Sequence, residues 1–237
     1  MRLACPYQLS PTQNLLGNGM MASAKNQTAG GYLPSDNPTS LVAWFRFGIG
    51  ITESGGFVSA WADQSGNGND LLQATGTNQP AYSAGILTFD GVDNFMKCVA
   101  FTLNQPTQVS MLAQQVSWAS QDIAIDGDTD ITGVIQQLVS SPTVRLYAGA
   151  GAAGNSDWAV GVFDAVTALF AGASSSLLVG TNAATTGNAG TSNMGGFTLA
   201  SAASGSFFFN MEVKEIIIRN VNDATIRQDD HDYLLTL

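Results

Sequence analysis

The chain has 237 residues, of which 45% are hydrophobic and only 11% are charged, and its formal net charge is −10. The length suits one large all-β domain or two small ones, and the hydrophobic fraction is enough for a packed core. Only eight Lys or Arg residues occur and they form no cluster, which excludes binding to nucleic-acid phosphates and argues against docking on anionic lipid.

Residues 1–39 show no sustained helical or strand period, and proline and glycine recur through them. This pattern predicts an extended N-terminal arm. Its apolar residues Leu15, Leu16, Met20 and Met21 are the candidate contacts with a partner subunit, and packing against the chain's own domain is the alternative. No apolar stretch precedes Cys5, so we expect no secretory signal, and no apolar run is long enough to span a membrane.

Residues 40–237 predict a single β-sandwich domain. Short strand candidates are separated by turn residues about every dozen positions, with no helical period between them, which is typical of sandwiches and barrels. The candidate strands are 41–47, 87–96 with a hairpin turn at Asp90-Gly91, 108–115, 133–139, 144–148, 158–163, 168–172, 177–179, 196–199 and 207–219.

The last candidate strand carries an irregular apolar pattern. Odd positions from Phe207 to Val213 are apolar, and then three isoleucines, 216–218, follow one another. Either a bulge shifts the register near Lys214, or both faces of the strand are covered. We favour the second interpretation, because an amphipathic segment follows directly.

That segment predicts a short C-terminal helix over the sheet. Asn222 or Asp223 can cap it. The stripe of Ile226, Tyr233 and Leu234 would face the sheet, while Asp229, Asp230, His231 and Asp232 would lie on the polar side.

Four segments, taken in order, resemble the laminin-G-like jelly roll found in bacterial and bacteriophage proteins, a concanavalin A-like fold. They are WADQSGNGND at 61–70, LTFDGVD at 87–93, FNMEVKEIIIR at 209–219 and the closing helix from Ala224 to Leu234. The resemblance covers residues 41–237 and implies an all-β, two-sheet antiparallel jelly-roll sandwich. It does not fix a function, because lectins, glycosidases, adhesion modules and virion proteins share this fold.

The carboxylates predict no active site. Glu53, Glu212 and Glu215 are the only glutamates, and the last two are three apart on a strand, so a period of two sends them to opposite faces. A retaining glycosidase needs two carboxyl groups about 5–5.5 Å apart in one cleft. His231 is the single histidine, and the sequence contains no Gly-x-Ser-x-Gly motif whose serine it could activate. We therefore expect no enzyme.

Three aspartates at alternate positions, Asp126, Asp128 and Asp130, open like an EF-hand calcium loop. Ile131 and Gln137 stand where that loop needs Gly and Glu. The pattern therefore favours an acidic surface turn over a calcium site, and we expect no metal or other cofactor.

Two further features leave alternatives open. Of the four tryptophans, Trp118 lies outside the strand-like runs and is the candidate glycan contact. Cys5 and Cys98 fit two free thiols in a reducing compartment, and a disulfide that ties down the arm is the alternative.

Together these features predict a non-enzymatic virion structural protein, a capsid decoration or cement protein or a fibre component. It would be made in the host cytoplasm and would bind other capsid or tail proteins and further copies of itself. The alternative is a carbohydrate-binding adhesion module for a cell-surface glycan, followed by a glycoside hydrolase.

Overall fold

The computed structural model describes residues 31–138, 140–149 and 153–237. Leu15, Leu16, Met20, Met21 and Cys5 lie outside these residues, so the predicted arm contacts and the pairing of Cys5 stay predictions. The strands are β1 Leu41–Phe45, β2 Ile51–Ser54, β3 Phe57–Trp61, β4 Leu71–Leu72, β5 Ala81–Ser83, β6 Ile86–Asp90, β7 Met96–Cys98, β8 Thr107–Gln115, β9 Ile123–Asp126, β10 Val134–Gln137, β11 Thr143–Tyr147, β12 Ala153–Asp157, β13 Asp164–Phe170, β14 Ser175–Val179, β15 Thr185–Gly187, β16 Thr198–Leu199 and β17 Asn210–Arg219. The helices are the short 3-10 turns η1 Pro34–Asp36, η2 Pro38–Ser40, η3 Gly76–Asn78 and η4 Gly172–Ser174, and the α-helix α1 Ala224–Leu234.

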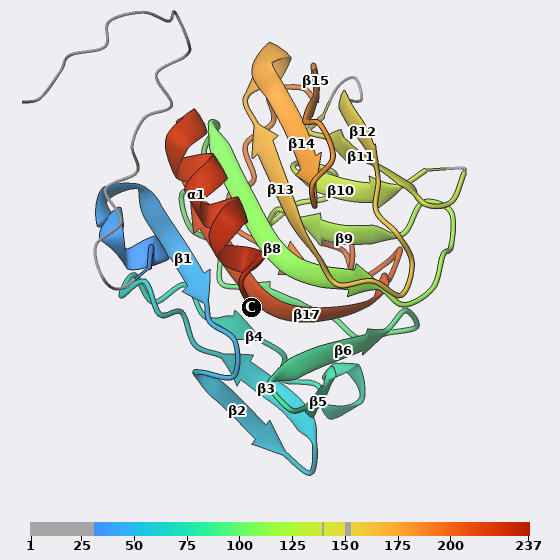
Figure 1. Cartoon of the computed structure of the whole chain (residues 1–237). Coiled ribbons are helices and arrows are strands. Elements are labelled where there is room, and N and C mark those ends of the chain that lie inside the picture. The colour runs from blue at the N-terminus through green and yellow to red at the C-terminus, as the bar shows by residue number, and fades with distance from the viewer. Residues whose placement is uncertain (1–30, 139, 150–152) are drawn as a thin grey trace, which may run out of the picture. The chain divides into compact units, whose positions relative to one another are not determined.

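The strands of the described residues form one nearly closed sheet that folds over a core (Figure 1). The first run is centred on β17, which pairs with β1 and β6 on one side and with β8 on the other. From β8 the run continues through β13, β14 and β15. The other run is β2, β3, β4, β7, β16, β9, β10, β11 and β12. Strand β5 pairs with β6 of the first run and with β3 of the second, and so joins the two runs. The predicted all-β class and the short C-terminal helix are confirmed, but the division into two separate jelly-roll sheets is not.

The core lies between the two runs of strands. Phe45 of β1 lies 5.6 Å from Trp61 of β3 and 6.4 Å from Phe197, measured between ring centres. Trp158 stacks on Phe209 at 5.8 Å. All five rings are fully buried. Burial of such large apolar side chains is the main favourable term that holds a sandwich together.

Strand β17 has both features that its apolar pattern suggested. Its pairing with β8 shifts between Val213 and Glu215, so a bulge lies at Lys214. Beyond the bulge, Ile216 and Ile218 belong to the main core, while Ile217 packs in the smaller cluster with Leu234 of α1. We had favoured a strand covered on both faces over a strand with a bulge. The strand has both features, so that prediction was incomplete.

Helix α1 begins and ends as predicted, but its polar side is not all exposed. Asp223 caps it, since its carboxylate accepts the N–H groups of Thr225 at 2.8 Å and Ile226 at 3.1 Å. Asp230 and His231 are buried against the sheet, contrary to the prediction. The physical reason is that both find hydrogen-bond partners there.

Arg219 of β17 is the main partner of Asp230. Its guanidinium group binds the carboxylate through Nε at 2.6 Å and Nη2 at 2.9 Å. The same group donates to the carbonyl oxygens of Pro34 at 2.8 Å and Asn37 at 2.7 Å, and to the hydroxyl of Tyr32 at 3.0 Å. These bonds hold residues 32–40 and α1 on one face of β17. The predicted domain boundary at 39/40 stays a prediction.

His231, next to Asp230, lies between Thr167 Oγ1 at 2.9 Å from its Nδ1 and the carbonyl oxygen of Gly180 at 2.8 Å from its Nε2. The ring thus bridges strand β13 and the turn after β14. Its place is structural, because both ring nitrogens are engaged.

Two strand predictions are wrong. Residues 158–163 form no strand apart from an isolated bridge at Val160, because Trp158 turns into the core. Residues 87–96 form no hairpin, since β6 pairs with β5 and β17 while β7 pairs with β4 and β16. The Asp90 side chain caps the turn by accepting the N–H of Val92 at 2.8 Å, and the chain then crosses to the other run.

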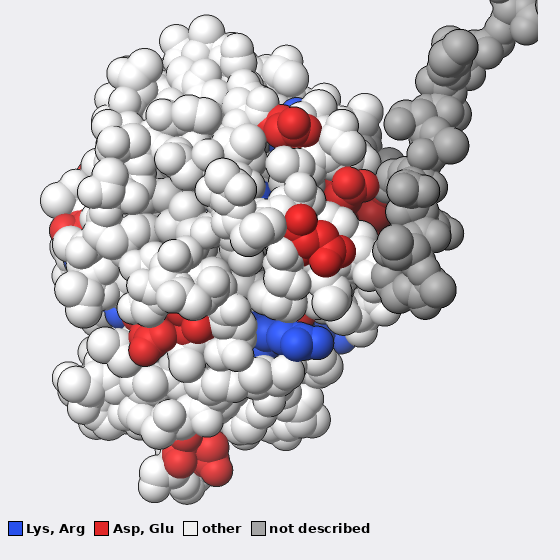
Figure 2. All heavy atoms as spheres, turned by 90° about the vertical axis from the view of Figure 1, so that its left-hand side faces the viewer, with Lys and Arg blue, Asp and Glu red and all other residues white. Residues whose placement is uncertain are grey.

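Uncharged residues cover most of the face that Figure 2 shows, with small groups of acidic and basic atoms between them. This agrees with the low charge content of the sequence. Among the described residues, no helix has the length and apolar character to cross a membrane.

Candidate functional site

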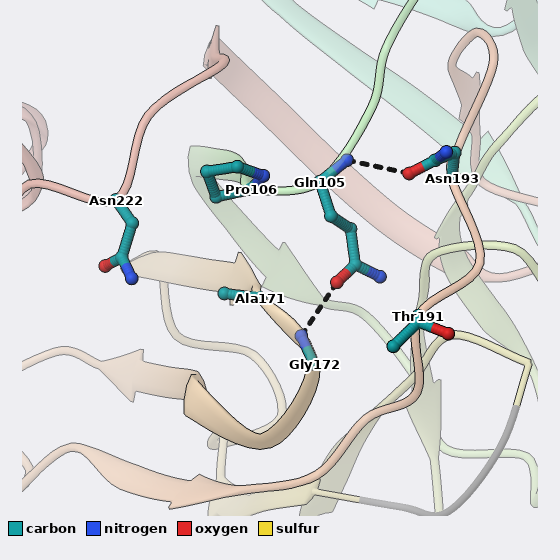
Figure 3. A pocket seen from close by; sticks show the side chains of 7 residues that line it. All are labelled: Gln105, Pro106, Ala171, Gly172, Thr191, Asn193 and Asn222. Carbon is teal, nitrogen blue, oxygen red and sulfur yellow. Dashed lines mark hydrogen bonds between the residues drawn. The ribbon is translucent and has the colours of Figure 1, made fainter.

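A hollow of about 480 Å³ opens where β8 begins and β13 ends (Figure 3). Its volume falls in the range of about 300–1,000 Å³ that is usual for ligand sites. Four loops form it: the turn before β8, the β13–η4 junction, the segment between β15 and β16, and the link from β17 to α1. The lining residues are Gln105, Pro106, Ala171, Gly172, Thr191, Asn193 and Asn222.

Gln105 fixes three sides of this pocket. Its Oε1 accepts the N–H of Gly172 at 2.7 Å, and its Nε2 donates to the carbonyl oxygens of Gly190 at 3.1 Å and Ser192 at 2.9 Å. Its backbone N–H donates to Oδ1 of Asn193 at 2.8 Å (Figure 3). One side chain thus spans loops that are 67 to 87 residues away in sequence.

The fourth side is fixed by Asn220, the residue directly after β17. Its Nδ2 donates to the carbonyl oxygens of Asn104 at 2.6 Å and Pro106 at 2.8 Å. This holds the turn before β8 close to Asn222, which accepts a hydrogen bond from Arg227 of α1 at 3.4 Å. The walls of the pocket are therefore built before any ligand arrives, which lowers the entropic cost of binding.

The described lining carries no ionisable side chain. It offers three side-chain amides, one hydroxyl, a proline ring and backbone groups. Amides and hydroxyls form neutral hydrogen bonds with oriented polar ligands. The pocket is thus suited to binding an uncharged polar molecule.

Trp118, the candidate glycan contact, lies far from this pocket. It follows the other end of β8, a strand of nine residues, or about 30 Å. Its side chain is half-buried. The side-chain amide of Gln137 holds its loop, accepting the N–H of Ala119 at 3.1 Å and donating to the carbonyl oxygen of Ser117 at 3.2 Å.

The two glutamates of β17 share one face, contrary to the prediction. The bulge at Lys214 changes the strand period, so Glu212 and Glu215 both point away from the main core. Glu215 is nevertheless only 1% exposed. It accepts hydrogen bonds from Trp44 Nε1 at 2.6 Å, the N–H of Phe47 at 3.0 Å and the hydroxyl of Tyr233 at 2.8 Å.

Those bonds give Glu215 a structural place. It joins β1, β17 and α1 and binds the backbone of the loop after β1 at Phe47. Glu212 is half-buried and accepts a hydrogen bond from Gln114 Nε2 at 2.6 Å. The pair lines no part of the pocket.

The three aspartates that resemble a calcium loop each have protein partners. Asp126 is fully buried and accepts N–H groups of Gly127, Ile131, Thr132 and Ala203. Burial raises its pKa, and these backbone hydrogen bonds oppose the shift.

The other two aspartates of that loop lie nearer the surface. Asp128 pairs with Lys97 at 3.1 Å, and Asp130 accepts the N–H of Ser204 at 2.7 Å. Within the described part of the chain, no group of three or more potential ligands could hold a metal ion.

Cys98 is a free thiol buried in β7. Its Sγ donates to the carbonyl oxygen of Asn69 at 3.2 Å. Burial raises the pKa of the thiol, and the nearby Asp63 and Asp70 add to the shift. A thiol in this state is a weak nucleophile.

Comparison with known proteins bears on the fold. No family model and no curated protein match the chain. Several solved structures do match the chain. A Trypanosoma rangeli sialidase in complex with sialic acid matches with a TM-score of 0.56 and 16% identity, over 82% of this chain and 33% of the sialidase.

The same sialidase as a covalent intermediate with 2,3-difluorosialic acid gives a TM-score of 0.58 at 14% identity. A GH54 α-L-arabinofuranosidase soaked with a cyclic sulfate inhibitor gives 0.58 at 11% identity, over 76% of this chain and 50% of the enzyme.

The fold is a β-sandwich shared with parts of glycan-active enzymes. The chain spans a third to a half of the matched structures. At these identities the likeness concerns the fold alone. The resemblance to a laminin-G-like domain is supported only as far as a β-sandwich.

Two predictions are overturned by these matches. The chain was expected to be a virion structural protein, but the matched structures are a sialidase and an arabinofuranosidase, and none of those named above is a virion component. It was also expected to be non-enzymatic, whereas its fold occurs within enzymes that act on glycans.

Proposed function

We propose that the chain is the glycan-recognising part of a glycan-active protein and that the pocket around Gln105 binds one sugar unit. The observation that carries the proposal is the lining: amides and a hydroxyl in a fixed frame, with no ionisable side chain. Sugar hydroxyls both donate and accept hydrogen bonds, which such groups can match. The likeness of the fold to a sialidase and an arabinofuranosidase supports a glycan as the ligand.

Trp118 is proposed as a second, independent glycan contact. Aromatic rings combine a large apolar face with a polar edge, which suits stacking on sugar rings. Since Trp118 lies beyond the opposite end of β8, its contribution can be separated from that of the pocket. We also propose the laminin-G-like jelly roll as the topological type of the domain.

A glycan array followed by calorimetry tests the proposed function. We expect binding to at least one glycan and a loss of at least about tenfold in affinity when Asn193→Ala and Asn222→Ala are combined, since each removes a hydrogen-bonding amide. Asn182→Ala is the matched control, because Asn182 is an exposed amide at the other end of β14. Binding to no glycan, or binding that only Trp118→Ala abolishes, would contradict the pocket as the site.

A further inference from the structure

The loop that joins β8 to β9 carries Trp118 and is fixed at both ends. At its start, the N–H of Val116 donates to the carbonyl oxygen of Asn210 at 3.0 Å. At its end, the N–H of Ile123 donates to the carbonyl oxygen of Phe207 at 2.9 Å. The loop therefore lies beside the segment that leads into β17, and its backbone is held before any ligand binds.

A tight turn within this loop brings Asp122 close to Trp118. The N–H of Asp122 donates to the carbonyl oxygen of Ala119 at 3.4 Å, and the Cα atoms at the two ends of such a turn lie less than about 7 Å apart. Ala119 directly follows Trp118. A half-buried aromatic ring and a half-buried carboxylate thus belong to one short, fixed loop.

The Asp122 carboxylate makes no hydrogen bond or ion pair with any of the described residues. Burial raises its pKa to about 6, so its ionised form carries a desolvation penalty at neutral pH. The fold gains nothing from this charge. Side chains that lower stability in this way are typical of sites where function requires them.

Backbone strain gathers at the same place. Among the described residues, five other than glycine have a positive φ, and four of them lie directly before, beside or after β9: Gln121, Ile131, Ala200 and Phe207. The φ of Gln121, the residue before Asp122, is +81°, and that of Phe207 is +54°. A positive φ is costly for side chains of this size, and strained residues cluster at ligand sites.

We infer that Trp118 and Asp122 together form a second glycan site, which takes a sugar ring without negative charge. The apolar face of the ring stacks on the indole, and sugar hydroxyl groups donate to the carboxylate. An ionised carboxylate only accepts hydrogen bonds, and it repels uronic acids. This inference rests on the proposed function, because it takes a glycan as the ligand, and it adds Asp122 to the Trp118 contact.

The other polar groups that hold the loop are uncharged. Gln136 Nε2 donates to the carbonyl oxygen of Gln121 at 3.1 Å, and the N–H of Gln137 donates to that of Asp122 at 2.9 Å. Arg145 of β11 stands behind Gln136 and donates to its Oε1 at 2.8 and 3.1 Å. A pH dependence of binding at this loop therefore reports the titration of Asp122.

The first test isolates the loop from the pocket and follows Trp118 itself. In the Asn193→Ala/Asn222→Ala variant, the remaining binding reports the loop. Since the other three tryptophans are buried, quenching of fluorescence by acrylamide reports Trp118. We expect a neutral oligosaccharide of glucose, galactose or mannose to protect Trp118 from quenching, and the corresponding uronic acid oligomer to bind at least about tenfold more weakly.

The second test changes the charge of the carboxylate. We expect the affinity of the same variant to be about tenfold higher near pH 7.5 than near pH 5, because only the ionised fraction of Asp122 binds. Adding Asp122→Asn should remove this dependence and leave the lower affinity at both pH values. Asp36→Asn is the matched control, because Asp36 is exposed and lies in η1, near the other end of β8.

The outcomes separate this site from the pocket. If the wild type binds neutral glycans but the pocket variant binds none, the loop site is overturned and the proposed role of the pocket stands. Affinity that is unchanged by pH and by Asp122→Asn overturns the role of Asp122. Tighter binding of the uronic acids, or of an arginine-rich peptide in place of every glycan, also overturns the loop site. Binding of no glycan by the wild type overturns both proposals.

Discussion

Gln105 shows how one uncharged side chain can build a site. It makes three hydrogen bonds to loops that meet only in the folded protein. Nothing in the sequence marked it, because a functional glutamine before a proline looks like any turn residue. Asn193 and Asn222 were missed for the same reason. Their shared role depends on four loops that no spacing in the sequence connects.

Replacing Gln105 by Ala should lower the free energy of unfolding by about 1–3 kcal/mol, since the N–H of Gly172 and two carbonyl oxygens lose their partner. Gln105→Glu keeps the acceptor for Gly172 and places an oxygen opposite the carbonyl groups of Gly190 and Ser192, so it should also destabilise. Urea unfolding measures both changes. Stability equal to the wild type in both variants would show that the loops hold their positions without this side chain.

Asp122, near Trp118, provides a test by pH. Burial raises its pKa to about 6. The folded state therefore binds the proton more tightly than the unfolded chain does, and this contribution to stability is present below pH 4 and lost as the pH rises through 6. Asp122→Asn removes the penalised charge.

We expect the melting temperature of Asp122→Asn to exceed that of the wild type at pH 7 and to match it near pH 4. Melting curves at several pH values measure the difference. A variant that is less stable than the wild type at pH 7 would mean that the Asp122 carboxylate has a favourable partner.

At the scale of elements, β17 and α1 separate what the sequence could predict from what it could not. Alternating residues before Lys214 and the cap are local signals: Phe209, Met211 and Val213 are buried as the alternation predicts, although Phe207 is exposed, and Asp223 is one of the two predicted capping residues. The bulge was considered but not preferred, because its cause lies in pairing with β8. Burial of Asp230 depends on Arg219, whose role as a buried partner no local pattern reveals.

The Arg219–Asp230 pair should be essential for the attachment of α1. Asp230→Asn leaves a fully buried guanidinium group without its counter-charge, which costs about 3–5 kcal/mol. Asp232→Asn changes an exposed carboxylate on the same helix and keeps an Oδ1 atom to accept the hydrogen bond that Gln228 donates at 2.7 Å, so it is expected to alter stability far less, by about 0.5 kcal/mol. Chemical denaturation compares the two. Equal effects would show that the buried pair adds nothing beyond a surface charge.

For the whole molecule, the all-β class, the C-terminal helix and most long strands followed from the sequence. Strands β8 and β17 match the predicted ranges 108–115 and 207–219 closely, whereas for β13 only 168–172 was predicted, so its first four residues were missed. Short strands such as β2, β5, β9 and β15 were missed, because three or four residues of mixed polarity carry little periodic signal. The function could not be predicted from the sequence. The low charge content indicated a protein that packs against other subunits, whereas the pocket is formed by four loops that meet only in the folded chain.

The central claim is that the hollow framed by Gln105 is a sugar site, and side-chain amide NMR tests it most directly. During titration with the best-binding glycan, the NH₂ signals of Asn193 and Asn222 should shift in proportion to occupancy, while that of Asn182 stays in place. Shifts confined to the loop of Trp118, or no shift in either asparagine at saturation, would contradict the account.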